Sequence, residues 1–309
     1  MDDITDMPFR ELCKEFGADL LVTEFIASEA LNRDAEKSRR KMLFAEEQRP
    51  IGIQIFGADE DELLRCLEVV EEANPDFIDI NWGCPVRKVA GKGAGSGILQ
   101  DIPKMLRITG SMVKHAHLPV TVKTRIAYNM ESVMITDFAE ALQDTGIAAL
   151  SIHGRTKTQM YSGTADWSVI GKVKNNPRIH IPIFGNGDIV SAAQAVECKR
   201  LYGVDGILIG RGAIGNPWIF EQCQRAFRGE EEREIGVGER VDICRRHLLS
   251  AVGFKGERTA IFEMRKHYAS YFKGLFNFKP FRLSLVSATT LDELEYTFSR
   301  IKENYQTYE

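Results

Sequence analysis

The chain has 309 residues, of which 44% are hydrophobic, enough to bury one large core and a smaller second one. No run approaches the ~20 uninterrupted apolar residues that a membrane helix needs. The N-terminus, with Asp2, Asp3 and Asp6, lacks the basic and apolar parts of a signal peptide. These features predict a cytoplasmic protein and exclude the membrane-spanning and secreted classes.

Short apolar or β-branched runs recur along the chain with helical stretches between them, which is βα repetition. Their hydrophobicity is nearly continuous, as expected for parallel strands covered on both faces by helices. The runs are 20–25, 51–56, 77–82, 120–126, 149–153, 181–184 and 206–209. The pattern predicts an α/β fold, with a (β/α)8 TIM barrel as its simplest closure.

Seven runs are one fewer than an eight-stranded barrel needs. The chain opens with residues 1–10, MDDITDMPFR, a sequence typical of a loop that enters a helix. We therefore expect the first strand to be missing or truncated. Unpaired edges would then border the gap in the sheet.

A different kind of segment follows the last strand. Residues 229–238 are acidic and contain glycine, which is typical of a linker. Beyond them, 241–254, 259–274 and 291–305 have helical periodicity and no strand-like run. We predict a barrel domain over 1–228 and a small all-α domain over 239–309.

The net charge of −4 argues against indiscriminate nucleic-acid binding, but the charge is unevenly distributed. Residues 245–282 hold nine Lys or Arg against two acids, a local +7 that leaves about −11 on the rest of the chain. Most of the aromatic residues interleaved there are expected to pack a helical bundle. The basic excess itself suits an RNA backbone.

The six cysteines are scattered singly, without a CxxC pair or the Cys/His spacing of a zinc site. We predict neither a disulfide framework nor a bound metal. His247 and His267 lie among basic residues and are interpreted as solvated surface imidazoles.

Cys84 lies near the end of residues 78–85, Ile-Asp-Ile-Asn-Trp-Gly-Cys-Pro, where a predicted strand ends before a proline. Parallel α/β enzymes present reactive side chains at this position, which favours a catalytic thiol over a buried hydrophobe. The glycine-rich loop 91–97 does not lead directly from strand to helix, so a Rossmann assignment is rejected. A mobile lid carrying Arg87, Lys88 and Lys92 is preferred, with a solvated flexible loop as the alternative.

Polar residues gather where the other strands end, as active-site residues do in barrels. They are Gln54, Asn81, Lys123, Arg125, His153, Arg155, Asn186, Gly187, Asp188, Gly210 and Arg211. The two glycine-bearing turns at 186–188 and 210–212 follow the last two strands, where barrels bind phosphate. Tight turns alone would also explain each glycine, but two adjacent turns favour a phosphate-bearing cofactor.

Taken together, these runs resemble the tRNA-dihydrouridine synthases, flavin enzymes that reduce a uracil ring in tRNA. The resemblance rests on Thr5–Arg10, Thr23-Glu24, Gln54–Gly57, Asn81–Pro85, Lys92–Gly95, Val122–Arg125, Ile152–Thr156, Gly185–Asp188 and Ile209–Gly212. It extends from the start to about Arg228, and residues 265–274 look like the family's helical tRNA-binding domain.

The resemblance implies a TIM-barrel oxidoreductase that binds FMN, takes electrons from NADPH and acts on tRNA, with a monomer as the default. It implies Cys84 as the general acid. It places Met1, Gln54 and Lys123 at the flavin ring. It makes Asn81 a substrate or flavin contact, with Arg125 and Arg155 near the substrate. His153, Asn186, Gly187, Asp188, Gly210 and Arg211 would hold the ribityl phosphate.

In the implied reaction, hydride adds to uracil C6 and Cys84 protonates C5 of a uridine taken out of its stack. Lys123 or Asn81 would stabilise charge at the C4 carbonyl. Since Met1 matches a residue that follows the family's first strand, we expect poor solubility or weak flavin retention for this chain. Two alternatives remain: an FMN barrel that reduces a small molecule, and a flavin-free, non-catalytic RNA-binding barrel.

Overall fold

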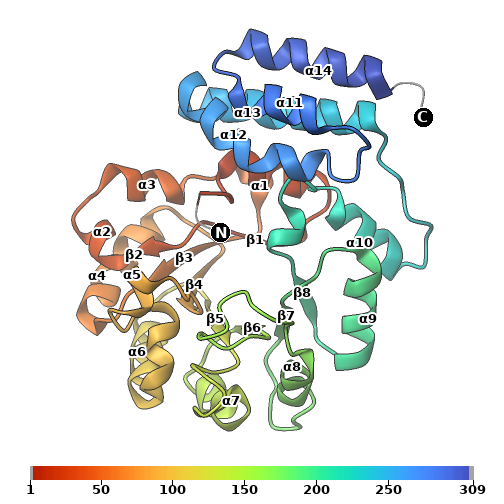
Figure 1. Cartoon of the computed structure of the whole chain (residues 1–309). Coiled ribbons are helices and arrows are strands. Elements are labelled where there is room, and N and C mark those ends of the chain that lie inside the picture. Colours follow the sequence, from red (N-terminus) through yellow and green to blue (C-terminus); the bar gives the residue numbers. More distant parts are fainter. Residues whose placement is uncertain (1–2, 306–309) are drawn as a thin grey trace.

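The computed structural model describes residues 3–305 (Figure 1). Its centre is a parallel sheet of order β1-β3-β4-β5-β6-β7-β8, with β2 also paired to β3. The strands are β1 (Leu21–Val22), β2 (Ile26–Ala27), β3 (Ile51–Phe56), β4 (Phe77–Trp82), β5 (Val120–Arg125), β6 (Ala149–His153), β7 (Ile183–Asn186) and β8 (Gly206–Leu208). Because β1 pairs with the start of β3 and β2 with its end, the two share one strand position. Six of the seven predicted runs are confirmed as strands, whereas the run 20–25 forms only the short β1, with β2 lying just beyond its end.

Helices cover the outside of this curved sheet, as in an α/β barrel (Figure 1). They are α1 (Met7–Glu15), α2 (Ser28–Asn32), α3 (Glu36–Met42), α4 (Glu60–Glu72), α5 (Arg87–Ala90), α6 (Ile102–His115), α7 (Ile135–Asp144), α8 (Trp167–Lys174), α9 (Ala192–Tyr202) and α10 (Ile219–Phe227). Short 3-10 turns occur at η1 (Glu46–Gln48), η2 (Gly95–Gln100) and η3 (Arg211–Ala213). Side-chain caps start the longer helices: Asp59 accepts from the Glu62 amide at 2.9 Å, and Asp101 from that of Lys104 at 3.0 Å.

The sheet is not closed within residues 3–305, because β1 and β8 pair with β3 and β7 but not with each other. Within these residues the sheet has seven strand positions, because β1 and β2 share one of them. Met1, expected at the flavin ring, lies outside the described residues.

After a linker, the chain forms a helical domain with a core of its own (Figure 1). Its helices are α11 (Val237–Lys255), α12 (Glu257–Tyr271), α13 (Lys279–Ser287) and α14 (Leu291–Tyr305). Helix α1 lies between the two units: Phe9 and Cys13 pack in the barrel core, whereas Leu12 packs in the helical core. Ion pairs of Arg246 with Glu15, at 2.8 Å, and of Lys255 with Asp6 join the same surfaces.

The interpretation of His247 and His267 as surface imidazoles is wrong. Both rings are buried, 4.7 Å apart between centroids, and both contact Phe9 of α1. Nδ1 of His247 lies 3.0 Å from the Tyr271 hydroxyl. Burial lowers the pKa of His267 to about 4 and that of His247 well below its usual range, so neither ring is charged at neutral pH. Two of the basic neighbours in the sequence, Arg246 and Lys255, pair with Glu15 and Asp6 at the same junction.

None of the helices in residues 3–305 combines the length and the apolar character that crossing a lipid bilayer would require.

Candidate active site

Strand register gathers the predicted polar residues at one end of the barrel. Asn81 is in register with Lys123, and Arg125 is in register with His153, which in turn pairs with Asn186. In a parallel sheet, residues in register point to the same face. The strand ends therefore bring five of the predicted residues together on the inner face of the barrel.

The turn that carries Cys84 is fixed by side chains at each of its backbone groups. The Asn81 side-chain oxygen accepts from the amides of Gly83, at 3.0 Å, and Cys84, at 2.8 Å. Arg125 Nε donates to the Gly83 carbonyl at 2.8 Å, and the Ser96 hydroxyl donates to the Cys84 carbonyl at 2.8 Å. The Cys84 side chain is buried, and these hydrogen bonds leave the backbone that carries it little freedom to move.

The prediction of a mobile lid over 91–97 is wrong for the second half of that segment. Gly95, Ser96 and Gly97 are buried in η2 against the Cys84 turn. A Cβ on Gly95, whose φ is +51°, would lie 2.9 Å from the Cys84 carbonyl oxygen. The glycines allow close packing beneath the thiol. Only the first half, with the exposed Lys92, resembles the predicted loop.

Beneath Cys84, Gln54 and Asn81 join a buried carboxylate that sequence reasoning missed. Asn81 Nδ2 donates to Gln54 Oε1 at 2.7 Å, and Gln54 Nε2 donates to Asp79 at 2.5 Å. Thr121 donates to the other Asp79 oxygen at 2.6 Å. Burial raises the pKa of Asp79, while these two hydrogen bonds and the nearby Lys123 charge oppose the rise. Polar alternation in a buried strand, Asp79 two residues before Asn81, was the available signal.

Lys123 has a perturbed ammonium group beside this network. Burial, and then the charge of Arg125, lowers its pKa to about 8, although Asp79 and Cys84 act in the opposite direction. Its side chain is only partly buried, and within residues 3–305 it forms neither a hydrogen bond nor an ion pair. A lysine with these properties can donate a hydrogen bond to a ligand or stabilise a developing anion.

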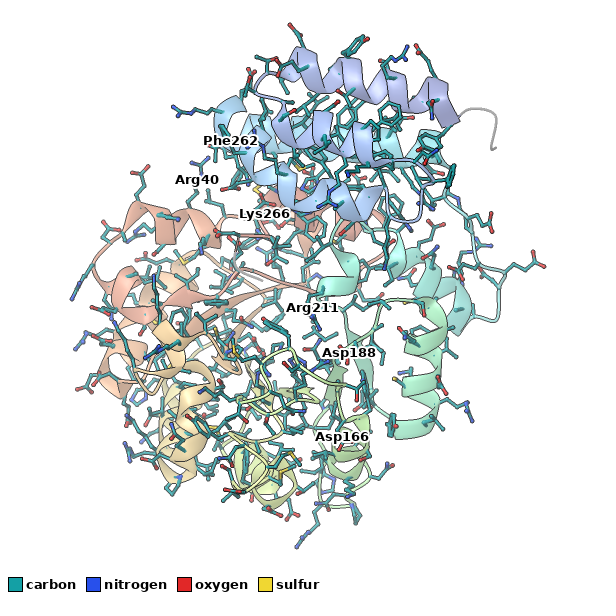
Figure 2. The ribbon with its side chains drawn as sticks, in the orientation of Figure 1. Arg40, Asp166, Asp188, Arg211, Phe262 and Lys266 are labelled. Carbon is teal, nitrogen blue, oxygen red and sulfur yellow. The ribbon has the colours of Figure 1, made fainter. Side chains whose placement is uncertain are left out.

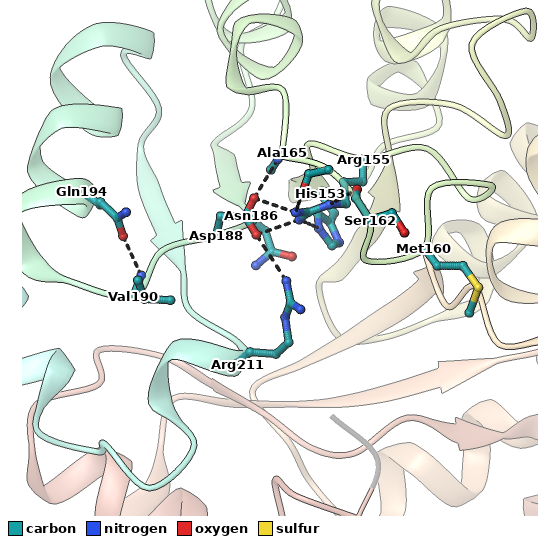
Figure 3. A network of polar contacts seen from close by, with 12 residues as sticks. His153, Arg155, Met160, Ser162, Ala165, Asn186, Asp188, Val190, Gln194 and Arg211 are labelled. Carbon is teal, nitrogen blue, oxygen red and sulfur yellow. Dashed lines mark hydrogen bonds and ion pairs between the residues drawn. The ribbon is translucent and has the colours of Figure 1, made fainter. Parts of the chain in front are cut away.

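At the ends of β6 to β8, cations outnumber carboxylates (Figure 3). Arg155 forms a two-point pair with Asp188, at 2.8 and 2.7 Å, and Arg211 contacts the same carboxylate at 3.2 Å. Burial acts to raise the pKa of Asp188, but hydrogen bonds from Arg155 and the Ala165 amide lower it overall. Burial and the surrounding cations lower the pKa of His153 to about 2, so its ring is neutral. This excess of positive charge favours an anionic ligand.

The two glycine turns leave backbone N–H groups available beside these cations. Within the described part of the chain, the amides of Gly187, Gly210, Arg211 and Gly212 donate no hydrogen bond. Gly187 has φ of +131°, and a Cβ there would lie 2.5 Å from the Cβ of Ala165. Glycine lets this turn pack against Ala165, and the unbonded amides can donate to an anion, as those of phosphate-binding turns do.

Arg125 and Arg155, the two arginines expected near the substrate, are fully buried and bind loop backbone. Arg125 donates to the carbonyls of Thr156, at 2.8 Å, and Met160, at 3.0 Å. Arg155 donates to those of Ser162, at 3.1 Å, and Gly163, at 2.6 Å. Together they hold loop 156–163 at the mouth of the barrel, and their role toward a substrate stays a prediction.

Replacing Arg155 with methionine is expected to lower the free energy of unfolding by about 3 kcal/mol, because the buried guanidinium bonds to Asp188 and to the carbonyls of Ser162 and Gly163. Arg211→Met, at the same carboxylate, should cost under about 1 kcal/mol. The difference arises because the Arg155 side chain is 2% exposed and that of Arg211 is 51% exposed. Urea denaturation of both variants measures this, and equal losses would contradict the assignment.

Comparison with known proteins agrees with this geometry. The family model described as "Dihydrouridine synthase (Dus)" matches residues 1–306. The chain belongs to the dihydrouridine synthase family. It is 34% identical over 284 residues to a probable tRNA-dihydrouridine synthase of Rickettsia conorii, covering 91% of this chain and 85% of that protein. It is 35% identical over 283 residues to tRNA-dihydrouridine synthase B of Pseudomonas aeruginosa, with the same two shares.

Among solved structures, this dihydrouridine synthase family member is similar to histamine dehydrogenase from Rhizobium sp. 4-9, with a TM-score of 0.55 and 12% identity. The match covers 79% of this chain and 46% of that one. At this identity the likeness shows the fold alone, which is the (β/α)8 barrel predicted from the sequence.

Proposed function

We propose that this chain is a tRNA-dihydrouridine synthase that reduces the C5=C6 bond of uridines in tRNA, with FMN as cofactor and NADPH as electron donor. The observation that carries the proposal is the fixed Cys84 turn beside Lys123, in a chain whose family match spans residues 1–306. The relatives named above are tRNA-dihydrouridine synthases, which supports the same substrate. We place the reaction in the cytoplasm, where tRNA is modified.

FMN fits the strand ends because the residues there suit a phosphate. Arg211 and the unbonded amides of Gly187 and Gly210 would hold it, with neutral His153 as a further contact. Gln54 and Lys123 would face the ring. Bound there, FMN would supply the hydride that adds to uracil C6.

The chain's own residues would then complete the reduction. The target uridine must leave its stack to reach the barrel interior. Lys123, which is cationic below about pH 8, would stabilise the negative charge that develops at the C4 carbonyl. The Cys84 thiol would deliver its proton to C5, while its held backbone keeps the sulfur in place.

The helical domain offers positive charge for an RNA backbone. Arg258, Lys273, Lys279 and Arg282 are exposed and form no ion pair within residues 3–305. Figure 2 labels Arg40 on the barrel side of the junction with the helical domain, and Lys266 and Phe262 of α12 on the other side. The Arg40 guanidinium carbon lies 4.9 Å from the centre of the Phe254 ring on α11. This contact places the basic last turn of α3 against the helical domain. An extended surface of this kind suits a tRNA larger than the barrel mouth.

The deciding experiment incubates the protein with FMN, NADPH and unmodified tRNA, then digests the RNA and locates by mass spectrometry any uridine that has gained two hydrogens. A defined modified position is the expected result. With the flavin bound and reducible, an RNA that gains no hydrogen at any uridine would overturn the proposal.

Replacing Arg258, Lys279 and Arg282 together with glutamine should weaken tRNA binding and flatten its salt dependence, by about one unit of slope for each phosphate that the variant no longer neutralises. The effect arises because each neutralised phosphate releases counterions on binding. Filter binding between about 50 and 200 mM salt measures it. An Arg233→Gln variant, whose arginine is already paired with Glu221 and Glu239, is the control and should keep the native slope.

A further inference from the structure

Asp79 lies one layer below the reactive turn and touches neither of the residues to which we assign chemistry. It is 4% exposed, on strand β4, and pairs in register with Gln54 on one side and Thr121 on the other. Its carboxylate accepts from both neighbours. A buried carboxylate is costly unless hydrogen bonds satisfy it, so its presence in a strand of apolar residues calls for an explanation.

The hydrogen bonds from Cys84 down to Asp79 have only one consistent direction. Backbone N–H groups can only donate, so the amides of Gly83 and Cys84 oblige Asn81 to present its oxygen to them. Asn81 Nδ2 then donates to Gln54 Oε1, which leaves Gln54 Nε2 facing Asp79. The last group must therefore be an acceptor, and an ionised carboxylate is an acceptor only.

We propose that Asp79 is a positioning residue: through Gln54 and Asn81 it sets the orientation of both amides and thereby holds the turn that carries Cys84. The proposal deepens the function proposed above, since it assigns to Asp79 the placement of the proton donor. Without the acceptor at position 79, Gln54 could rotate by half a turn and bring its NH2 group against Asn81 Nδ2, which would push the Asn81 amide out of its present orientation. The Gly83 and Cys84 amides would then lose their common acceptor.

Alkylation of the cysteines tests this without substrate. The full-length protein reacts with iodoacetamide, and mass spectrometry gives a rate for each cysteine peptide. Asp79→Leu removes the acceptor of the relay. Thr121→Val is the matched control, because it removes the other hydrogen bond to the same carboxylate and leaves Gln54 its partner.

Asp79→Leu should raise the alkylation rate of Cys84 by about fivefold or more through local opening, whereas Thr121→Val should change it by less than about twofold. Buried Cys13 and Cys66 report on global opening and should react as slowly as in the wild type. Equal Cys84 rates in the two variants would overturn the proposal. A parallel rise at all three cysteines would also overturn it, because Asp79 would then support the fold as a whole.

A polarity swap gives a second test that does not depend on tolerance of leucine in the core. Gln54→Glu places two carboxylates 2.5 Å apart and should accelerate Cys84 alkylation at about pH 8.5, where a shared proton is disfavoured. In the Asp79→Asn, Gln54→Glu double variant, the new amide at position 79 donates to the new carboxylate at position 54. That carboxylate still accepts from the side chain of Asn81. The Cys84 rate should return to within about twofold of the wild type.

A double variant as reactive as Gln54→Glu alone would show that hydrogen-bond direction is irrelevant, and the proposal would fail. Because no RNA or NADPH enters these measurements, a chain that reduces no uridine can still confirm the relay. Conversely, the enzyme could be fully active while Asp79→Leu leaves the alkylation rate of Cys84 unchanged. The proposed function would then stand, and the positioning role of Asp79 would be wrong.

Discussion

Cys84→Ala is expected to reduce dihydrouridine formation by a factor of roughly 10²–10⁴, the contribution of a positioned general acid. The same variant should still bind flavin and let NADPH reduce it, because the proposed mechanism uses the thiol only in the half-reaction with uridine. The Cys84 backbone is held by Asn81, Arg125 and Ser96 rather than by its side chain. Removing one sulfur atom should therefore leave the turn in place.

Two measurements separate these half-reactions: bleaching of the flavin absorbance by NADPH, and mass spectrometry of the tRNA product. Cys198→Ala is the control, since Cys198 on α9 is the one partly exposed cysteine among the described residues and lies on the outer layer of the barrel. It should be fully active. Undiminished uridine reduction by Cys84→Ala would remove Cys84 from the mechanism.

Lys123→Met should have two effects of opposite sign. Uridine reduction should fall by about 10²–10³, because a preorganised cation at the developing charge is removed. The protein itself should become more stable at neutral pH, because burial and Arg125 both disfavour the Lys123 cation in the folded chain. Turnover assays and urea denaturation at pH 7 measure the two effects on the same preparation.

The sign of the pH dependence follows from the lowered pKa of Lys123. Its folded value, about 8, is below the unfolded one, so the unfolded chain binds more protons between about pH 8 and 10.4. Lys123 therefore makes the free energy of unfolding rise with pH across that window, and Lys123→Met should lack the rise. Flavin affinity should change in the opposite sense and weaken above about pH 8 as the ammonium group deprotonates.

Lys123→Arg is the matched variant for this experiment, since arginine stays charged across the whole range. Its flavin affinity, followed by fluorescence quenching, should be nearly independent of pH up to about 10. If wild type and Lys123→Arg lost affinity together above pH 8, another group would be responsible.

The strands were predictable because their residues carry a local signal. Runs such as Ile51–Phe56 are mostly apolar and buried on both faces, as strands of a parallel sheet covered by helices are. The interruption between β1 and β2 was not foreseen, since residues 20–25 look like one continuous strand and the two pieces are defined only by pairing with β3. Pairing is a tertiary property that no local run encodes.

Site residues that end a strand could be predicted from the sequence. A residue that acts by holding the side chain of another residue was much harder to predict. Asn81 and Cys84 follow directly from the end of β4. Asp79, by contrast, sits within the strand and gains meaning only through register with Gln54 and Thr121. The prediction for His247 and His267 failed for a related reason: their partner, Phe9, is more than 230 residues earlier in the chain.

Helix α1 has a further consequence for how the molecule is made. One face of α1 is covered by the barrel and the other, around Leu12, by helices that are translated more than 220 residues later. During synthesis, α1 must therefore keep an apolar face exposed until the ribosome has delivered α11 to α14. We expect the nascent barrel to stay loosely organised around α1, and to recruit chaperones there, until the C-terminal helices close over it.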